Sequence, residues 1–202
     1  MIVIIDYVIS NIGAVKNALD YLKINSKVSS STSEIAKAKK IIIPGNGNFG
    51  EGIKLLKKKA IDKVLHEQIL YKKKPVLGIC LGYQLMFEKS EEDINSQGLG
   101  WIKGSVHKFI KKKNYSVPHV GWNNIRFRNL KVMKGIPNDV RFYFDHSYYP
   151  IIKNNHFSFG DTEYIVKFPS IYEKANIVGC QPHLEKSQKY GLLMLKNFSH
   201  AC

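Results

Sequence analysis

The chain has 202 residues, 44% of them hydrophobic, which is enough to bury a substantial core, and we predict a single domain over residues 1–202. It carries 31 Lys and Arg against 16 Asp and Glu, a formal net charge of +15, but nearly all the basic residues are lysines in short, separate clusters without a nucleic-acid-binding module. No apolar run approaches the ~20 residues of a membrane-spanning helix, so we expect neither a nucleic-acid partner nor a membrane partner.

The first half of the chain alternates short apolar runs with segments of helical periodicity, a pattern typical of a parallel sheet with crossover helices. Apolar residues recur every three or four positions in the longer segments, and the short runs are rich in β-branched residues. The expected strands are 1–6, 27–29, 41–43 and 76–79, and the expected helices are 11–22, 51–72 and 84–90.

From Lys103 onward the pattern changes to short strands separated by turns. We expect strands at 106–110, 124–128, 141–148 and 164–168, followed by a last helix at 187–199. The predicted fold class is therefore α/β, with an open, mainly parallel sheet, added mixed or antiparallel strands and flanking helices.

The strand expected at 76–79 runs directly into the pattern Gly-x-Cys-x-Gly at 78–82. Two glycines allow a strained strand-to-helix turn that lifts the Cys80 thiol above the end of the sheet. The N-terminus of the following helix favours the thiolate form. This context favours a reactive thiol at Cys80, whereas Cys180 lies in an apolar run and is better explained as a small buried residue. With Cys202 the cysteines number three at unpaired spacings, which indicates a reduced, cytoplasmic protein.

Far downstream, His183 and Glu185 stand two residues apart, so in an extended segment they project to the same side. A lone histidine would be interpreted as structural. With a nucleophile candidate elsewhere, the pair supplies the base and the group that orients it, and we predict a catalytic triad of Cys80, His183 and Glu185. The histidines lack metal-ligand spacing and no nucleotide-binding loop is present, so no metal and no other cofactor is expected.

Further motifs lie in register along almost the whole chain, at 4–7, 44–50, 78–88, 98–100, 117–123, 142–149 and 179–187. Together they resemble the class I, or triad-type, glutamine amidotransferases, and within these the glutaminase subunits of imidazole glycerol phosphate synthases. Pro-His-x-Gly-Trp-Asn at 118–123 and His-Ser-Tyr-Tyr at 146–149 point to this branch. The resemblance implies a flavodoxin-like open sheet and hydrolysis of L-glutamine to glutamate and ammonia.

A glycine-flanked loop follows the strand at 41–43, at the same end of the sheet as the cysteine turn. One of its N–H groups, with that of the residue after the nucleophile, would hold an oxyanion. The resemblance adds residues that bind the rest of glutamine, although a simple turn at 44–47 and an ordinary half-buried strand at 146–149 remain open from the residues alone. The expected substrate-binding residues are Gly45, Asn46, Gly47, Leu81, Gln84, Ser147 and Tyr148.

Nothing in the chain looks able to accept ammonia, and the resemblance implies a partner that does. This partner is a (β/α)₈-barrel cyclase or synthase subunit, which forms a heterodimer with the glutaminase and makes imidazole glycerol phosphate in histidine biosynthesis. Trp122 is a candidate anchor because Trp is enriched at interface hot spots, with a core tryptophan as the alternative. The residues implied at the interface are Asn11, Trp122, Asn123 and Lys186.

Three departures from the family pattern leave the expected catalytic atoms unchanged and alter the surface that would face the partner. The family has a glycine-rich turn where this chain has residues 7–11, other neighbours around His183 than Pro182 and Leu184, and an apolar residue at Asp145. One alternative is therefore a paralogue that supplies ammonia to a related synthase, for acetamidino-sugar formation in bacterial surface polysaccharide biosynthesis. A catalytically silent regulatory module and another thiol hydrolase on the same fold also remain open.

Overall fold

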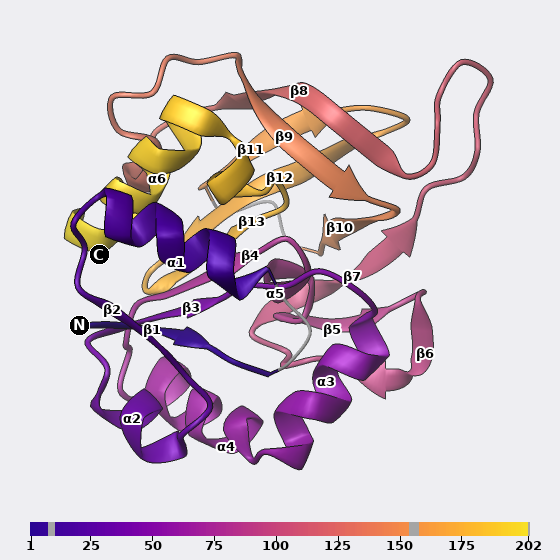
Figure 1. The fold of residues 1–202 in the computed structure, drawn as a ribbon. Coiled ribbons are helices and arrows are strands. Elements are labelled where there is room, and N and C mark those ends of the chain that lie inside the picture. Colours follow the sequence, from indigo (N-terminus) through magenta and orange to yellow (C-terminus); the bar gives the residue numbers. More distant parts are fainter. Residues whose placement is uncertain (8–10, 154–157, 202) are drawn as a thin grey trace.

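The computed structural model describes residues 1–7, 11–153 and 158–201, and its centre is a nine-stranded sheet (Figure 1). The strand order is β2-β1-β3-β4-β13-β12-β11-β8-β9. The strands from β2 to β13 in this order run parallel, whereas each later neighbouring pair is antiparallel. The bounds are β1 Ile2–Ile5, β2 Ser26–Ser29, β3 Lys40–Ile43, β4 Val76–Ile79, β8 His119–Phe127, β9 Val140–His146, β11 Ser158–Glu163, β12 Lys167–Lys174 and β13 Ile177–Cys180.

A second, four-stranded sheet of order β10-β7-β5-β6 lies beside the first, and its strand β10 contacts β12. Helices α1 and α6 lie together on one face of the large sheet, and α2, α3 and α4 lie on the other (Figure 1). The strands of the four-stranded sheet are β5 Phe87–Ser90, β6 Asp93–Gln97, β7 Ile102–Lys108 and β10 Tyr148–Ile152. The helices are α1 Ile12–Tyr21, α2 Thr32–Lys37, α3 Phe49–Lys58, α4 Ile61–His66, α5 Leu81–Gln84 and α6 Gln188–Ala201, with a π-helical turn at Glu67–Tyr71 and 3₁₀ turns at Lys131–Met133 and Leu184–Lys186.

The two helical layers explain the composition of the central strands. Strands β1 and β4 are buried at every position, as is β3 from Ile41 to Ile43. A parallel strand that is covered on both faces has no water-facing side, so its sequence is continuously apolar instead of alternating. The predicted fold class, a parallel core with added antiparallel strands and flanking helices, is confirmed, although the separate small sheet was not expected.

Two predicted helices differ from the structure. The helix expected at 51–72 is broken at Ala60, which has a left-handed φ of 54° between α3 and α4. The helix expected at 84–90 is wrong, because α5 ends at Gln84 and the strand β5 follows. Phe87 pairs with Ile102 of β7, and the apolar residues before it are buried on all sides, so their periodicity could not distinguish a helix from a buried strand.

Some predicted strands are also shifted. The strand expected at 164–168 begins later, because Tyr164 donates to the carbonyl of Val166 in the turn that joins β11 to β12, and only residues 167 and 168 belong to β12. The strand expected at 141–148 divides at Ser147 into β9 and β10, which belong to different sheets. Helix α2 and strand β13 were not predicted. Positions 8–10, which belong to the segment 7–11 that departs from the family pattern, lie outside the described residues, as does Cys202.

The topology gathers the predicted functional segments at one end of the parallel core. Strands β3, β4 and β13 are neighbours, and their carboxyl ends lead into residues 44–48, Cys80 and 181–186. In open α/β sheets this end of the strands is where ligands bind. Among the described residues, no helix combines the length and the apolar composition needed to cross a membrane.

Candidate active site

A cavity of about 310 Å³ opens above Cys80 at the carboxyl ends of these strands. Its volume suits a small ligand. It includes every predicted substrate-binding residue except Gly45, which is buried. The lining residues are Asn46, Gly47, Cys80, Leu81, Gln84, Glu92, Pro118, Asp145, His146, Ser147, Tyr148, His183 and Lys186.

Cys80 occupies a strained turn between β4 and α5. Its φ of 53° and ψ of −111° are unfavourable for a residue with a side chain, and such strain is typical of nucleophile turns. A Cβ on Gly78 would lie 2.7 Å from the carbonyl oxygen of Gly82, and a Cβ on Gly82 would overlap the carbonyl of Ile43, so both glycines are required for the close approach of backbone. Cys180 on the neighbouring strand is fully buried, and burial raises the pKa of its thiol well above the usual value, as expected for a structural cysteine.

His183 lies between a carboxylate and the thiol. Its Nδ1 atom is 2.8 Å from Oε1 of Glu185, and the imidazole is hydrogen-bonded to Cys80. Because Nδ1 faces the carboxylate, Nε2 is the nitrogen that faces the sulfur. The side chains of His183 and Glu185 are 3% and 1% exposed. The structure thus brings the three predicted catalytic residues together in the order nucleophile, base and orienting acid.

The charges in this group favour an ion pair. Burial favours the neutral imidazole, but the Cys80 thiolate and the Glu185 carboxylate outweigh it and raise the pKa of His183 to about 10. A protonated His183 beside the sulfur is an arrangement that activates a cysteine nucleophile. Asn11 Nδ2 donates to Oε1 of Glu185 at 3.3 Å, while the buried Oε2 has no hydrogen-bond partner among the described residues.

The predicted oxyanion donors are not assembled in this conformation. The N–H of Leu81 donates to the carbonyl oxygen of Gly45 at 3.3 Å, so a carbonyl occupies the position that an oxyanion would take. Gly47, two residues after Gly45, has a φ of 107°, a value that favours glycine. Rotation of the peptide between Gly45 and Asn46 would release the Leu81 N–H and turn a second N–H toward the cavity.

Two comparisons with known proteins agree on the family. The family model for glutamine amidotransferase class-I matches residues 3–202. The chain belongs to this class I glutamine amidotransferase family. It is 40% identical over 199 residues to "Imidazole glycerol phosphate synthase subunit HisH 2" of Pseudomonas aeruginosa and 42% identical over 201 residues to "Imidazole glycerol phosphate synthase subunit HisH 1" of Methanococcus maripaludis, covering 98% of both chains in each case.

Solved structures show the same fold at lower identity. PurLQS from Thermotoga maritima is similar with a TM-score of 0.75 at 15% identity, over 98% of this chain and 96% of that one. The fold is therefore shared by a protein whose sequence differs greatly from that of this chain.

One residue of this amidotransferase that the sequence analysis missed is Gln181. It is fully buried, and its Nε2 donates to the sulfur of Cys80 at 3.7 Å. The Nε2 of Gln84 donates to Oε1 of Gln181 and to the carbonyl of Tyr148, both at 2.9 Å, so Gln84 has only its carbonyl oxygen left for a ligand. The signal was available, because Gln181 precedes His183 by two residues, and alternation before the 3₁₀ turn at Leu184–Lys186 places 181 and 183 on one side.

A second missed residue is Glu92, which lines the cavity from the turn between β5 and β6. Its Oε2 accepts the N–H of Phe49 at 2.7 Å, and burial raises the pKa of its carboxyl group. No local motif marks this position. Only the docking of the small sheet against the start of α3 brings the carboxylate to the cavity.

The residues implied at a partner interface fall into separate environments. Trp122 is 45% exposed, so the alternative of a core tryptophan is wrong. It packs edge-on against Tyr143, with ring centroids 6.0 Å apart, and the Nζ of Lys186 lies 5.4 Å from the same Tyr143 ring. Asn11 instead contacts the triad, and Asn123 lies at a second cavity beside β8.

The remaining departures have clear positions in the fold. Pro182 and Leu184 are buried, and the N–H of His183 between them donates to the carbonyl of Tyr143 at 2.9 Å. Asp145 is exposed at the mouth of the cavity, and its backbone carbonyl lies 3.9 Å from the Cys80 sulfur. Asp145 therefore lines the cavity at a position where the family pattern has an apolar residue.

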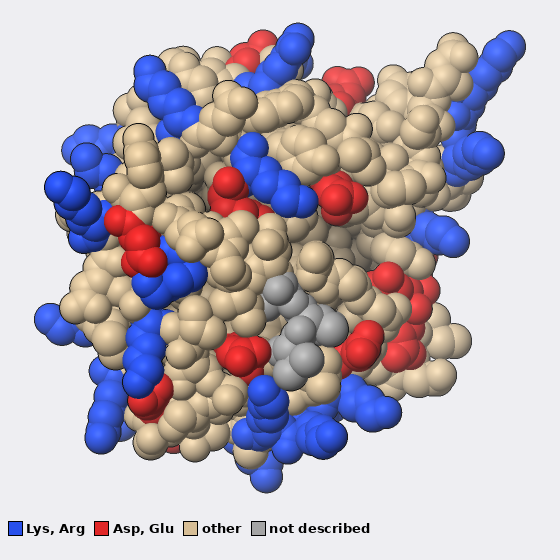
Figure 2. Space-filling view, viewed as in Figure 1, with Lys and Arg blue, Asp and Glu red and all other residues tan. Residues whose placement is uncertain are grey.

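The positive charge is not gathered at this cavity, whose lining includes one Lys and no Arg. On the face shown in Figure 2, Lys and Arg side chains are spread over the surface, most of them near the margin, with Asp and Glu side chains between them. Among the residues that the structure describes, no group of three His, Cys, Asp or Glu side chains could hold a metal ion.

Proposed function

We propose that this chain is the glutaminase subunit of an imidazole glycerol phosphate synthase. The observation that supports this most is the contact of His183 with both Glu185 and Cys80 in a ligand-sized cavity. The relatives that are about 40% identical over nearly their whole length carry the name of this subunit. The whole chain, 1–202, acts as one amidotransferase domain in the cytoplasm, with L-glutamine as substrate and no metal or other cofactor.

The reaction uses the thiolate of Cys80 as the nucleophile. The sulfur attacks the side-chain carboxamide carbon of glutamine, and the tetrahedral oxyanion is held by backbone N–H groups of the loop at 45–47 and of Leu81. His183 gives its proton to the departing ammonia, which leaves a thioester. His183 then takes a proton from water as the water hydrolyses that thioester. Glu185 keeps the imidazole in the required tautomer and stabilises its charged form.

The cavity also offers groups for the amino-acid end of glutamine. Glu92 supplies a carboxylate for the α-ammonium group, and the backbone of Ser147 and Tyr148 supplies hydrogen bonds. The carbonyl oxygen of Gln84 can accept from the substrate. This arrangement predicts a preference for free glutamine over substrates in which the α-amino and α-carboxyl groups are blocked, as they are within a peptide.

The proposal includes a partner that receives the ammonia and switches the site on. The carbonyl of Gly45 blocks the Leu81 N–H, so hydrolysis requires rotation of the loop. Docking of a (β/α)₈-barrel synthase subunit around Asn11, Trp122, Asn123 and Lys186 would drive this rotation. The surface formed by Trp122, Tyr143 and Lys186 supports such docking, because exposed aromatic residues are enriched at interfaces.

The deciding experiment is a steady-state glutaminase assay of the chain alone and with its barrel subunit and acceptor. We expect slow hydrolysis alone and an acceleration of about 10²–10³, the value of one oxyanion donor. A covalent glutamine analogue should label Cys80 in the complex. An unlabelled chain would favour a catalytically silent regulatory module, and equal rates with and without the partner would favour a free-standing thiol hydrolase.

A second candidate function is supply of ammonia to a related synthase for acetamidino-sugar formation. Both relatives carry a number after the subunit name, as expected where an organism has more than one such chain. In this chain Asp145 at the cavity rim also departs from the family pattern. Rescue of a histidine auxotroph that lacks its glutaminase subunit separates the two: growth supports histidine biosynthesis, and failure with an active glutaminase supports the sugar pathway.

A further inference from the structure

Two buried histidines beside the cavity take no part in the triad. His119 begins β8 and His146 ends β9, and they are directly opposite each other in the antiparallel pair. They are 3% and 6% exposed, and His119 stacks between the rings of Phe144 and Tyr164. Burial lowers the pKa of His119 to about 4 and that of His146 to about 3. At neutral pH each ring is therefore neutral, with one donor nitrogen and one acceptor nitrogen.

The hydrogen bonds of this pair determine which nitrogen carries the proton. His146 Nδ1 lies 2.8 Å from the carbonyl oxygen of Tyr148, which can only accept, so Nδ1 is the donor. His146 Nε2 is then an acceptor, and His119 Nδ1, 3.0 Å away, must donate to it. His119 Nε2 is an acceptor in turn, and Asn123 Nδ2 donates to it at 3.2 Å.

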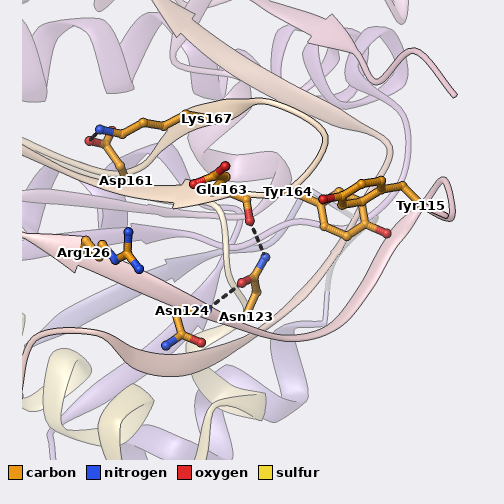
Figure 3. Close-up of a pocket in the computed structure, with 8 residues that line it drawn as sticks. All are labelled: Tyr115, Asn123, Asn124, Arg126, Asp161, Glu163, Tyr164 and Lys167. Carbon is orange, nitrogen blue, oxygen red and sulfur yellow. Dashed lines mark hydrogen bonds and ion pairs between the residues drawn. The ribbon is translucent and has the colours of Figure 1, made fainter. Parts of the chain in front are cut away.

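The outer end of this series of hydrogen bonds lies at the surface. The Oδ1 of Asn123 accepts the N–H of Asn124 at 2.8 Å, which identifies Nδ2 as the donor, and the second N–H goes to the carbonyl of Glu163 at 3.0 Å (Figure 3). Asn123 also lines an open cavity of about 550 Å³ beside β8. Every donor from Asn123 inward is therefore committed in one direction.

The inner end lies at the glutamine site. The carbonyl of Tyr148 accepts from His146 and also from Gln84, which donates at 2.9 Å. Gln84 bonds to Gln181, which donates to the sulfur of Cys80. A peptide held by two donors keeps its orientation, and loss of one donor loosens both Tyr148 and Gln84.

We propose that Asn123, His119 and His146 are positioning residues, which hold Tyr148 and Gln84 in the geometry that binds glutamine. The proposal rests on the proposed function, because it concerns the same site. It specifies the direction of the hydrogen bonds, in which each group from Asn123 inward donates to the next as far as the carbonyl of Tyr148. If the outermost donor becomes an acceptor, both imidazoles must change tautomer, and the carbonyl of Tyr148 loses its N–H.

Asn123→Asp tests this direction. Asp has nearly the shape of Asn, but its carboxylate only accepts, so His119 must turn its proton outward and His146 follows. We expect L-glutamine to bind about two- to tenfold more weakly, the value of one buried hydrogen bond. Calorimetry on the full chain carrying Cys80→Ala measures binding without turnover or partner.

Asn124→Asp is the matched control. It introduces the same charge at the next residue and removes two hydrogen bonds of its own to Asp139, but it makes no side-chain bond to a histidine. We expect unchanged glutamine affinity. Equal weakening in both variants would overturn the proposal, because a general effect of charge or stability would then explain it.

Nitrogen NMR of the imidazoles reports which ring nitrogen carries the proton. A merely structural role of Asn123 would leave these tautomers unchanged. In the wild-type chain both histidines should carry the proton on Nδ1, and in Asn123→Asp both should carry it on Nε2. His146→Asn keeps an N–H close to the Nδ1 position and should bind glutamine more tightly than His146→Leu. A wild-type Nε2–H tautomer at either histidine would overturn the proposal.

These outcomes are distinguishable from failure of the proposed function. If the chain with Cys80→Ala bound no glutamine, the proposed function would fail, whatever the tautomers are. If it bound glutamine with equal affinity in the Asn123→Asp variant, only the positioning role would fail.

Discussion

Two histidines line the same cavity with opposite electrostatics. The pKa of His183 is raised to about 10, whereas that of His146 is lowered to about 3. Both are buried, so desolvation lowers the pKa of each, and the difference comes from their partners. His183 faces a carboxylate and a thiolate, while His146 faces a carbonyl, the neutral His119 and the positive His183. Burial alone therefore does not decide the charge of a histidine; the groups that share its pocket do.

The difference follows the architecture of the sheet. Charged residues follow the carboxyl ends of the parallel strands β4 and β13, where strand ends and turns converge. The neutral pair lies on the antiparallel strands β8 and β9, surrounded by aromatic rings. The first region carries out the chemistry that we propose, and the second forms a polar but uncharged wall.

Removing the nucleophile should have the largest effect. Cys80→Ala should lower glutamine hydrolysis about 10⁴-fold or more, because no other group can form the thioester. Synthesis from added ammonia in the complex should persist. Cys180→Ala, which removes a buried thiol outside the cavity, is the control and should keep activity. Loss of both glutamine-dependent and ammonia-dependent synthesis would mean that Cys80 is structural.

Neutralising the orienting acid should rank second. Glu185→Gln should reduce kcat about 10³–10⁴-fold while the fold persists, since the imidazole loses its tautomer anchor. The same substitution should also lower the pKa of His183 toward the low pKa values of His119 and His146, as nitrogen NMR titration would show. Glu163→Gln, an exposed carboxylate on β11, is the control. Near-normal turnover in Glu185→Gln would remove Glu185 from the triad.

Restricting the oxyanion loop should have a smaller effect. Gly47→Val places a β-branched residue at a φ of 107°, which should hinder rotation of the loop. The acceleration by the partner should fall about tenfold or more, with less effect on glutamine binding. Gly13→Ala in α1, where a Cβ would meet no atom within 4 Å, is the control. An unchanged partner response would contradict gating by this loop.

The smallest effect concerns stability against pH and tests the comparison directly. For His119 and His146 the folded-state pKa lies below the unfolded value of about 6.5, so stability should fall as pH drops below about 6.5, by up to about 1.4 kcal/mol per pH unit for each. For His183 the sign is opposite, and its contribution should be complete below about 6.5 and lost as pH rises toward about 10.

Urea unfolding between pH 4.5 and 6.5 measures the acid side. His146→Asn cannot be protonated in this range, so its stability should depend on pH less steeply than that of the wild-type chain. An equal slope in both proteins would mean that His146 is already charged in the folded state.

The parallel core and the three reactive residues could be predicted from sequence because their signals are local. Continuous β-branched runs such as Ile41 to Ile43 need burial on both faces, and Gly78 and Gly82 stand where a Cβ would meet backbone. The two-residue spacing of His183 and Glu185 did identify the pair, but the 3₁₀ turn Leu184–Lys186 brings them together and not the extended segment that was expected. Gln181 stands two residues before His183 and could have been found from the same spacing. The helix expected at 84–90 failed because pairing with β7 decided a run whose apolar residues fit either structure.

What only the tertiary structure decided are the contacts between distant elements. Glu92 reaches the cavity because the small sheet docks on α3, and the carbonyl of Gly45 blocks Leu81 because β3 and β4 are neighbours. The hydrogen bond between His119 and His146 joins two residues that are 27 positions apart in the sequence. Its direction depends on Tyr148 and Asn123 together. The sequence by itself determined which groups can react, because residue type and short-range geometry set reactivity. Charge state, proton position and loop conformation depend on neighbours in space, so the tertiary structure alone determined them.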